Sequence, residues 1–290
     1  MTSPLLSCRF ELSLSRGGCK LRIHTLVARR AAKLLLPLAI LAGIAGVAEA
    51  MRVSPMVIEM TAKGSGATGR LEIQNLNDTQ LAYETRITRI DYDAEGKMTE
   101  TPADEDFLVF PPQGVLQPKA RQVVRLQWLG SPDIAASQGY YVSVNQLPVK
   151  LAPGATVEPG AQVQVVYHMK ALVVVAPPNA QPKVEVVSAK PVMIAPKADP
   201  GSKEPGKGAP EPGVEVTVRN TGARHAMMAG ARWTIEGKGP DGKPLTVVLD
   251  QEALNREIGV GYVAALKGQR SFQVHTGTAF GPAPIKVRFN

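Results

Sequence analysis

Residue types that often carry catalysis are present in this chain but are not grouped. Three histidines lie far apart in residues 51–290, and none belongs to an HExxH pair that could hold zinc: they are His168, His225 and His275. No GxSxG, Walker A or GxGxxG pattern stands between an expected strand and an expected helix. The acidic group Asp104–Asp106 could be paired carboxylates or a cation site, but a solvated loop before a buried strand is the simpler interpretation. The sequence therefore predicts no enzyme, metal site or cofactor.

Composition also disfavours thiol chemistry and nucleic-acid binding. Both cysteines, Cys8 and Cys19, lie within the first 50 residues. The net charge is +8, but residues 1–50 carry +5 of it and leave only +3 for the rest of the chain. Aromatic residues make up 5% of the sequence, which is few for a surface that stacks sugars or single-stranded bases.

Residues 1–50 have the pattern of a secretory signal peptide with a long n-region. A basic flank at 29–33 precedes the apolar run 34–48, and small residues follow up to Ala50. This order predicts export to the periplasm and cleavage after Ala50, with Val27 as an alternative translation start. A membrane anchor is the alternative, but the apolar run is shorter than the roughly 20 residues that span a bilayer. Cleavage would remove both cysteines, and no later stretch is apolar enough to span a membrane.

One long apolar stretch, 161–175, contains a single basic residue, Lys170. Its first residues alternate between polar and apolar types, and valine is enriched throughout, which predicts a β-strand. At about 3.3 Å per residue it would extend roughly 50 Å, twice the usual strand or more. Such a strand either crosses a whole domain or lends part of its edge to another chain.

The rest of the mature chain consists of short alternating segments between turn residues, which favours two all-β sandwich domains in tandem. We expect an N-terminal domain over 51–176, a proline-rich linker over 177–182, and a C-terminal domain over 183–290 with a mobile loop at 195–213. One helical turn is expected at 252–257. The other expected strands are 53–60, 70–74, 81–92, 107–110, 122–128, 140–147, 183–188, 214–219, 231–236, 245–249, 269–275 and 285–289.

Several segments resemble the periplasmic pilus-assembly chaperones of the chaperone–usher pathway. Residues 106–126, DFLVFPPQGVLQPKARQVVRL, are similar to that family's F-x-V-x-P-P, L-x-P and Q-x-V-R pattern. Residues 140–148, YYVSVNQLP, look like its aromatic strand followed by N-x-x-P, and the stretch 161–175 comes next in the family's order. The turn at 220–222 and Trp233 look like the family's second-domain turn and core tryptophan. Trp128 is expected in the core of the first domain.

This resemblance implies two immunoglobulin-like domains set at an angle, without catalytic activity or cofactors. Such chaperones bind pilus subunits that lack one strand of their own sandwich, lend them an edge strand, and pass them to an outer-membrane usher. Ala161, Val163 and Val165 match the residues of the lent strand. Lys170 matches a basic anchor, meaning a residue that holds the subunit's C-terminal carboxylate, although it could be an ordinary solvated lysine. A strict pleat puts Val163 and Val165 on the face opposite Lys170 unless a bulge intervenes.

The second basic anchor of the family is missing at its usual place. The resemblance implies an arginine just before two apolar residues of the first strand, and Met56 stands there in this chain. Arg52 or Arg125 could substitute, although Arg125 also fits an exposed position on a sheet.

Two other function classes remain open on sequence grounds. The main alternative is an exported two-domain β-sandwich with a structural or adhesive role on the surface, which would take a strand rather than lend one. A ligand-binding module would need a clustered aromatic face that the sequence does not show. The lent edge could also pair with a second copy of the chain.

Overall fold

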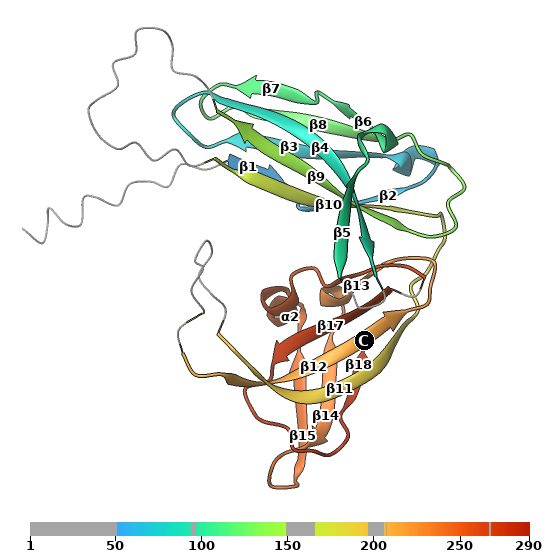
Figure 1. Ribbon diagram of the computed structural model, residues 1–290, viewed down its shortest axis with the longest axis vertical. Coiled ribbons are helices and arrows are strands. Elements are labelled where there is room, and N and C mark those ends of the chain that lie inside the picture. Colours follow the sequence, from blue (N-terminus) through green and yellow to red (C-terminus); the bar gives the residue numbers. More distant parts are fainter. Residues whose placement is uncertain (1–50, 94–96, 149–165, 197–205, 207, 267) are drawn as a thin grey trace, which may run out of the picture. The chain divides into compact units, whose positions relative to one another are not determined.

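The alternating segments fold into strands that pack as two immunoglobulin-like β-sandwiches, as predicted (Figure 1). The computed structural model describes residues 51–93, 97–148, 166–196, 206, 208–266 and 268–290. The predicted signal peptide and the predicted donor residues Ala161, Val163 and Val165 therefore lie outside the described residues. The predicted domain boundaries stay predictions.

The first sandwich combines two sheets of the described chain. One sheet has the strand order β1-β3-β8-β6, and the other has the order β2-β10-β9-β4-β5, with β7 also paired to β4. The strands are β1 (Met51–Ser54), β2 (Val57–Thr61), β3 (Thr68–Asn75), β4 (Leu81–Tyr92), β5 (Met98–Pro102), β6 (Phe107–Phe110), β7 (Gln113–Leu116), β8 (Arg121–Trp128), β9 (Gln138–Leu147) and β10 (His168–Ala176). Short 3-10 helices lie at Gly64–Ala67 and Asp104–Asp106.

Period-two alternation buries one face of each sheet against the other. Three aromatic rings meet edge to face within this core, with centroids 5.2 Å apart for Phe107 and Trp128, 4.9 Å for Phe107 and Tyr140, and 5.8 Å for Trp128 and Tyr140. Such pairs each add about 0.5–1.5 kcal/mol to the burial of apolar area. Trp128 is thus a core residue, as expected, whereas Arg125 on the same strand is exposed.

The second sandwich has its own core around Trp233, which is fully buried. Its sheets have the orders β11-β12-β17 and β15-β14-β18, and β13 pairs with β16. The elements are β11 (Val184–Ile194), β12 (Glu211–Asn220), β13 (Ala226–Met227), a 3-10 helix (Met228–Gly230), β14 (Trp233–Lys238), β15 (Pro244–Leu249), α2 (Gln251–Ile258), β16 (Tyr262–Val263), β17 (Gly268–His275) and β18 (Lys286–Phe289).

The structure corrects several predicted elements. The strand predicted over 53–60 is wrong, because β1 and β2 belong to different sheets with Pro55 between them, and proline has no N–H to give to a ladder. β5 and β7 were not predicted, since β5 has no buried residue and β7 is a four-residue strand in which only Leu116 is buried. The helical turn at 252–257 is longer and forms α2, whose first turn is capped by the Asp250 side chain accepting the Ala253 N–H. β12 begins at Glu211, inside the predicted loop 195–213.

A buried asparagine ends β3 and fixes the turn that follows. The Asn75 side-chain amide donates to three backbone carbonyls, those of Thr79 at 2.8 Å, Gln117 at 3.0 Å and Leu116 at 3.3 Å. Its side-chain oxygen accepts the Asn77 N–H at 3.0 Å. Asn75 is fully buried, so water could not take its place as the hydrogen-bond partner of these backbone groups.

The second sandwich repeats this device at the end of β12. The Asn220 side-chain oxygen accepts the N–H groups of Lys183 at 2.9 Å and Gly222 at 3.0 Å. Its amide donates to the carbonyls of Arg224 at 2.7 Å and Ala264 at 3.2 Å. Asn220 is also fully buried, and it positions the loop that carries Arg224.

Replacing Asn75 by alanine should lower the free energy of unfolding by about 3 kcal/mol, because several buried backbone groups lose their partner at once. Urea unfolding followed by circular dichroism measures this change. The control Asn255→Ala removes an exposed asparagine of α2 and should change stability by less than about 0.5 kcal/mol. Equal effects of the two substitutions would contradict the assigned role of Asn75.

Candidate functional site

One edge of β10 is paired along only part of its length. On one side, β10 runs antiparallel to β9 over residues 168–175. On the other side, it runs parallel to β2 over residues 172–176 only. Among the described residues, no strand covers this second side over 168–171, which we call the open edge. Figure 1 shows β10 lying between these two neighbours.

The backbone at the open edge offers unused hydrogen-bonding groups. The Leu172 N–H donates to the Met56 carbonyl at 2.9 Å, so the peptide groups of Leu172 face the side on which β2 lies. Because peptide groups of successive strand residues point alternately to the two edges, those of His168 and Lys170 also face this side. A partner strand placed there would meet donors and acceptors in register.

The predicted uninterrupted strand over 161–175 is wrong at Val166 and Tyr167, which lie outside β10. The Tyr167 N–H donates to the side-chain oxygen of Gln146 at 3.3 Å instead of to a backbone carbonyl of β9. The Tyr167 carbonyl still accepts the Gln146 N–H at 2.9 Å, and the regular residue pairs with β9 begin at His168.

The two faces of β10 lead to different surroundings. Val173 and Val175 belong to the core of the first sandwich, and Met169 packs against it. Leu172 and Val174 belong to a separate small apolar cluster. By alternation, Lys170 shares the face of Leu172 and points away from the core.

Lys170 forms an ion pair with a carboxylate that lies three strands away in the sheet. Its Nζ is 2.7 Å and 2.8 Å from the two carboxylate oxygens of Glu100 on β5, and it lies 5.5 Å from the ring centroid of Tyr141. The Thr88 hydroxyl donates to the same carboxylate at 3.0 Å. The hydrogen bond from Lys170 is the main reason that the pKa of the Glu100 carboxyl lies below its usual value.

A cavity of about 480 Å³ opens beside Lys170 and contains a second cation, Arg270 of β17. The Arg270 guanidinium donates to the Tyr262 carbonyl at 2.7 Å and lies 5.9 Å from the ring centroid of Tyr92 and 5.1 Å from that of Phe272. Its position is therefore fixed by one hydrogen bond and by ring contacts. Residues that line the remaining wall include Met56, Val57, Tyr141, Leu172, Ile258 and Val260.

The structure does not bring the predicted alternative anchors to this cavity. Met56 lines it, whereas Arg52 lies on β1 in the other sheet and lines a separate recess with Glu72 and Arg121. Arg125 lies on β8, also in the other sheet. Arg270 was missed because it lies on a strand of the second sandwich, where nothing in the spacing of residues points to Lys170.

The remaining candidate residues take part in structural hydrogen bonds. His168 Nδ1 lies 3.1 Å from the side-chain oxygen of Asn145, and His275 Nδ1 lies 2.7 Å from a Glu257 oxygen. In the acidic group Asp104–Asp106, the first carboxylate accepts the Ile87 N–H at 2.8 Å and the last accepts the Tyr140 hydroxyl at 2.8 Å. The interpretation as a merely solvated loop was therefore incomplete. In the described part of the chain, no group of three His, Cys, Asp or Glu side chains is placed to hold a metal ion.

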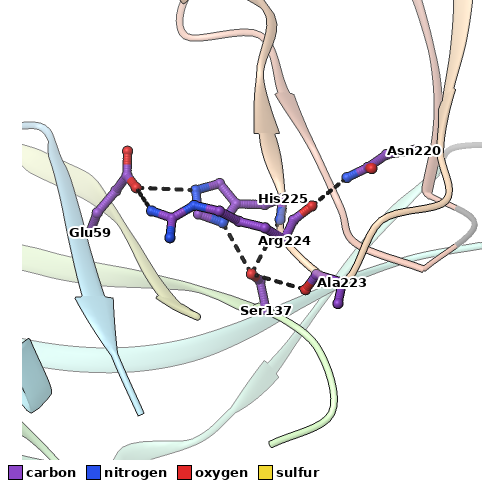
Figure 2. A network of polar contacts seen from close by, with 6 residues as sticks. All are labelled: Glu59, Ser137, Asn220, Ala223, Arg224 and His225. Atoms are coloured by element: carbon purple, nitrogen blue, oxygen red, sulfur yellow. Dashed lines mark hydrogen bonds and ion pairs between the residues drawn. The ribbon is translucent and has the colours of Figure 1, made fainter. Parts of the chain in front are cut away.

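A polar network connects β2, the neighbour of β10, to the second sandwich (Figure 2). The carboxylate of Glu59 pairs with the Arg224 guanidinium and lies 3.6 Å from His225 Nε2. The Ser137 hydroxyl lies 3.2 Å from both the backbone nitrogen and Nδ1 of His225, and 3.4 Å from the Ala223 carbonyl. Burial lowers the pKa of His225 to about 4, against the opposing effect of the Glu59 charge.

The first part of the described chain matches the model of a known protein family. Residues 50–181 match the family model of the pili and flagellar-assembly chaperone, PapD N-terminal domain. The first sandwich therefore matches the N-terminal domain of pilus-assembly chaperones, which confirms the resemblance that the sequence predicted. A search among curated proteins finds no match.

Solved structures of fimbrial chaperones are similar to this chain at low identity. The class 5 fimbriae chaperone CfaA has a TM-score of 0.48 at 11% identity, with 83% of this chain and 92% of that chain covered. A complex of Salmonella enterica SafA pilin with the SafB chaperone gives 0.44 at 13%, with 84% and 99% covered. The E. coli chaperone DraB gives 0.44 at 13%, with 83% and 96% covered. In the described residues, no helix has the length and apolar character of a membrane span.

Replacing His225 by glutamine should flatten the pH dependence of stability between pH 4 and 6.5. In this range the unfolded chain binds a proton at His225 and the folded chain does not, so the unfolding free energy of the wild type rises with pH and is lost as pH falls from 6.5 towards 4. The contribution of His225 to the free energy of unfolding amounts to at most about 3 kcal/mol. Urea unfolding at a series of pH values measures it, with His168→Gln as the control for an exposed histidine. If the unfolding free energy of His225→Gln still rose with pH as steeply as that of the wild type, His225 would not be the group responsible.

Proposed function

We propose that this chain is a periplasmic chaperone that binds and stabilises pilus subunits by donor-strand complementation and delivers them to an outer-membrane usher. The observation that carries the proposal is the open edge of β10 at residues 168–171, beside a segment that is fully paired. The family match of residues 50–181 supports a chaperone role and the absence of catalytic activity.

The proposed binding mode needs no sequence-specific polar contacts along the strand. A subunit strand added to the open edge would form main-chain hydrogen bonds, while alternate side chains of the lent strand fill the subunit's groove. The predicted donor residues Ala161, Val163 and Val165 precede this edge directly in the sequence. Each valine fully buried in the groove would contribute about 1.5–3 kcal/mol. The complex would also cover an unpaired edge that otherwise invites aggregation.

Lys170 would hold the end of the bound subunit. Its backbone belongs to the open edge, and its side chain faces the cavity that also contains Arg270. A C-terminal carboxylate that binds there would set the register of the subunit strand on β10. Charge-assisted hydrogen bonds of this kind contribute more than neutral ones.

The main alternative is an exported structural or adhesive protein of the cell surface. Such a protein would receive a strand, whereas the open edge here is adjacent to an apolar stretch suited to being lent. Cell fractionation separates the two functions, because the chaperone is expected in the periplasm and the adhesive protein on the surface. A resting chaperone could also pair with a second copy through the open edge, which sedimentation of the mature chain would detect.

Replacing Val163 and Val165 together by aspartate should abolish the protection of a co-expressed subunit, because charged side chains cannot enter an apolar groove without a large desolvation cost. The measurement is the amount of subunit that survives in the periplasm and co-purifies with the chaperone. The control carries aspartate at the exposed positions Val186 and Val248 of the second sandwich. Equal subunit recovery with both double variants would refute donation of this strand.

Changing Lys170 to glutamate should reduce subunit capture by about tenfold or more through loss of a charge-assisted hydrogen bond. The fold should be retained, since the side chain is about half exposed. The matched control is Lys190→Glu, which reverses the same charge in an ion pair of the second sandwich. Co-purification of the subunit and thermal unfolding of the free chaperone are measured side by side. Unchanged capture by a folded Lys170→Glu variant would contradict the anchor role.

A further inference from the structure

Counting only the described residues, the cavity beside β10 has one more positive than negative charge. Lys170 and Arg270 line its wall, and no carboxylate is among the residues that do. Glu100 reaches Lys170 from β5 and balances one of the two cations. Within the described residues, Arg270 forms no ion pair with a carboxylate, so one positive charge is left over. This surplus fits one additional carboxylate.

The ion pair between Lys170 and Glu100 is suited to the replacement of Glu100 by another carboxylate. β9 and β4 separate β10 from β5, so the two side chains meet across about 14 Å of sheet, three strand spacings. The side chains of Lys170 and Glu100 are 47% and 26% exposed, and ion pairs in such settings contribute only about 0–1 kcal/mol. A competing carboxylate with a second cation in reach could therefore displace Glu100 from Lys170.

Arg270 is held in a way that leaves most of its donors available. One N–H bonds to the Tyr262 carbonyl, and the guanidinium lies over the rings of Tyr92 and Phe272. A guanidinium has five donors, so further hydrogen bonds can be made without moving the group. Burial raises the pKa of Tyr141, and the nearby charges of Glu100 and Arg270 shift this pKa up and down, respectively.

We infer that Glu100 is a resident carboxylate of the free protein, that a ligand carboxylate replaces it at Lys170, and that Arg270 is the second cation that binds this ligand. The apolar wall formed by Met56, Leu172 and Val260 fits an apolar side chain next to the carboxylate. The ligand class is thus a polypeptide end with a free carboxylate and an apolar last residue. The inference rests on the proposed function for the source of that polypeptide, but the site itself is tested without a subunit.

The probe is a synthetic peptide of alternating valine and serine that ends in phenylalanine, prepared both as the free acid and as the C-terminal amide. Its binding to the mature chain, residues 51–290, is measured by fluorescence anisotropy. The wild type should bind the acid more tightly than the amide.

Glu100→Gln should bind the acid about twofold to fivefold more tightly than the wild type, because residue 100 loses its charge while it keeps its shape. Arg270→Gln should bind the acid about tenfold more weakly. Neither variant should change binding of the amide.

Two matched controls isolate the site from general charge effects. Glu215→Gln removes a carboxylate that pairs with Lys190 at 2.8 Å, much as Glu100 pairs with Lys170. Arg219→Gln removes an arginine from the same sheet as Arg270. Both controls should bind acid and amide as the wild type does.

The outcomes separate this inference from the proposed function. If Lys170→Gln loses the preference for the acid while Glu100→Gln and Arg270→Gln match the wild type, the roles of Glu100 and Arg270 are refuted and the single anchor stands. Equal binding of acid and amide by the wild type refutes the carboxylate site altogether. Donation of the strand is tested by the aspartate substitutions at Val163 and Val165, which do not depend on the peptide result.

Discussion

The hydrogen-bonding demand of β10 governs the arrangement of the first sandwich. From Leu172 to Ala176 the side chains of β10 are buried on both faces, so water cannot reach the backbone and both edges must be paired within the protein. β9 supplies one edge and β2 the other. Before Ala171 the side chains of His168 and Lys170 are exposed, so water can reach the second edge there. Burial begins at Ala171 and pairing with β2 begins one residue later, at Leu172.

The break at Pro55 makes this division of β10 possible. Because the first strand changes sheets there, β1 pairs with β3 and only β2 runs beside β10. A continuous strand over 53–60 would have stayed in one sheet. Glu59 of β2 also contacts Arg224, whose carbonyl is held by the buried Asn220. The strand that closes half of β10 is thereby tied to a rigid turn of the second sandwich.

Local sequence patterns predicted the elements whose burial is periodic. The bounds of β4 and β6 were predicted fully, because the alternating segment of β4 and the short apolar run of β6 each end at polar or turn-forming residues. β5 escaped prediction because an exposed edge strand has no apolar face, and Glu100 was missed with it. Lys170 stood out only because the residues around it are apolar. Its partners could not be predicted, since Glu100 lies three strands away in the sheet and Arg270 in another sandwich.

The position of Arg270 determines which parts of the protein a carboxylate bound at Lys170 would connect. An arginine at the position of Met56 would place both cations on neighbouring strands of one sheet. In this chain Lys170 belongs to the first sandwich and Arg270 to the second, so a carboxylate held by both would link the two. Met56 then serves as apolar wall, consistent with a ligand whose last side chain is buried beside its carboxylate. The cavity thus has two cations, Lys170 and Arg270, although Met56 stands where the family resemblance implies an arginine.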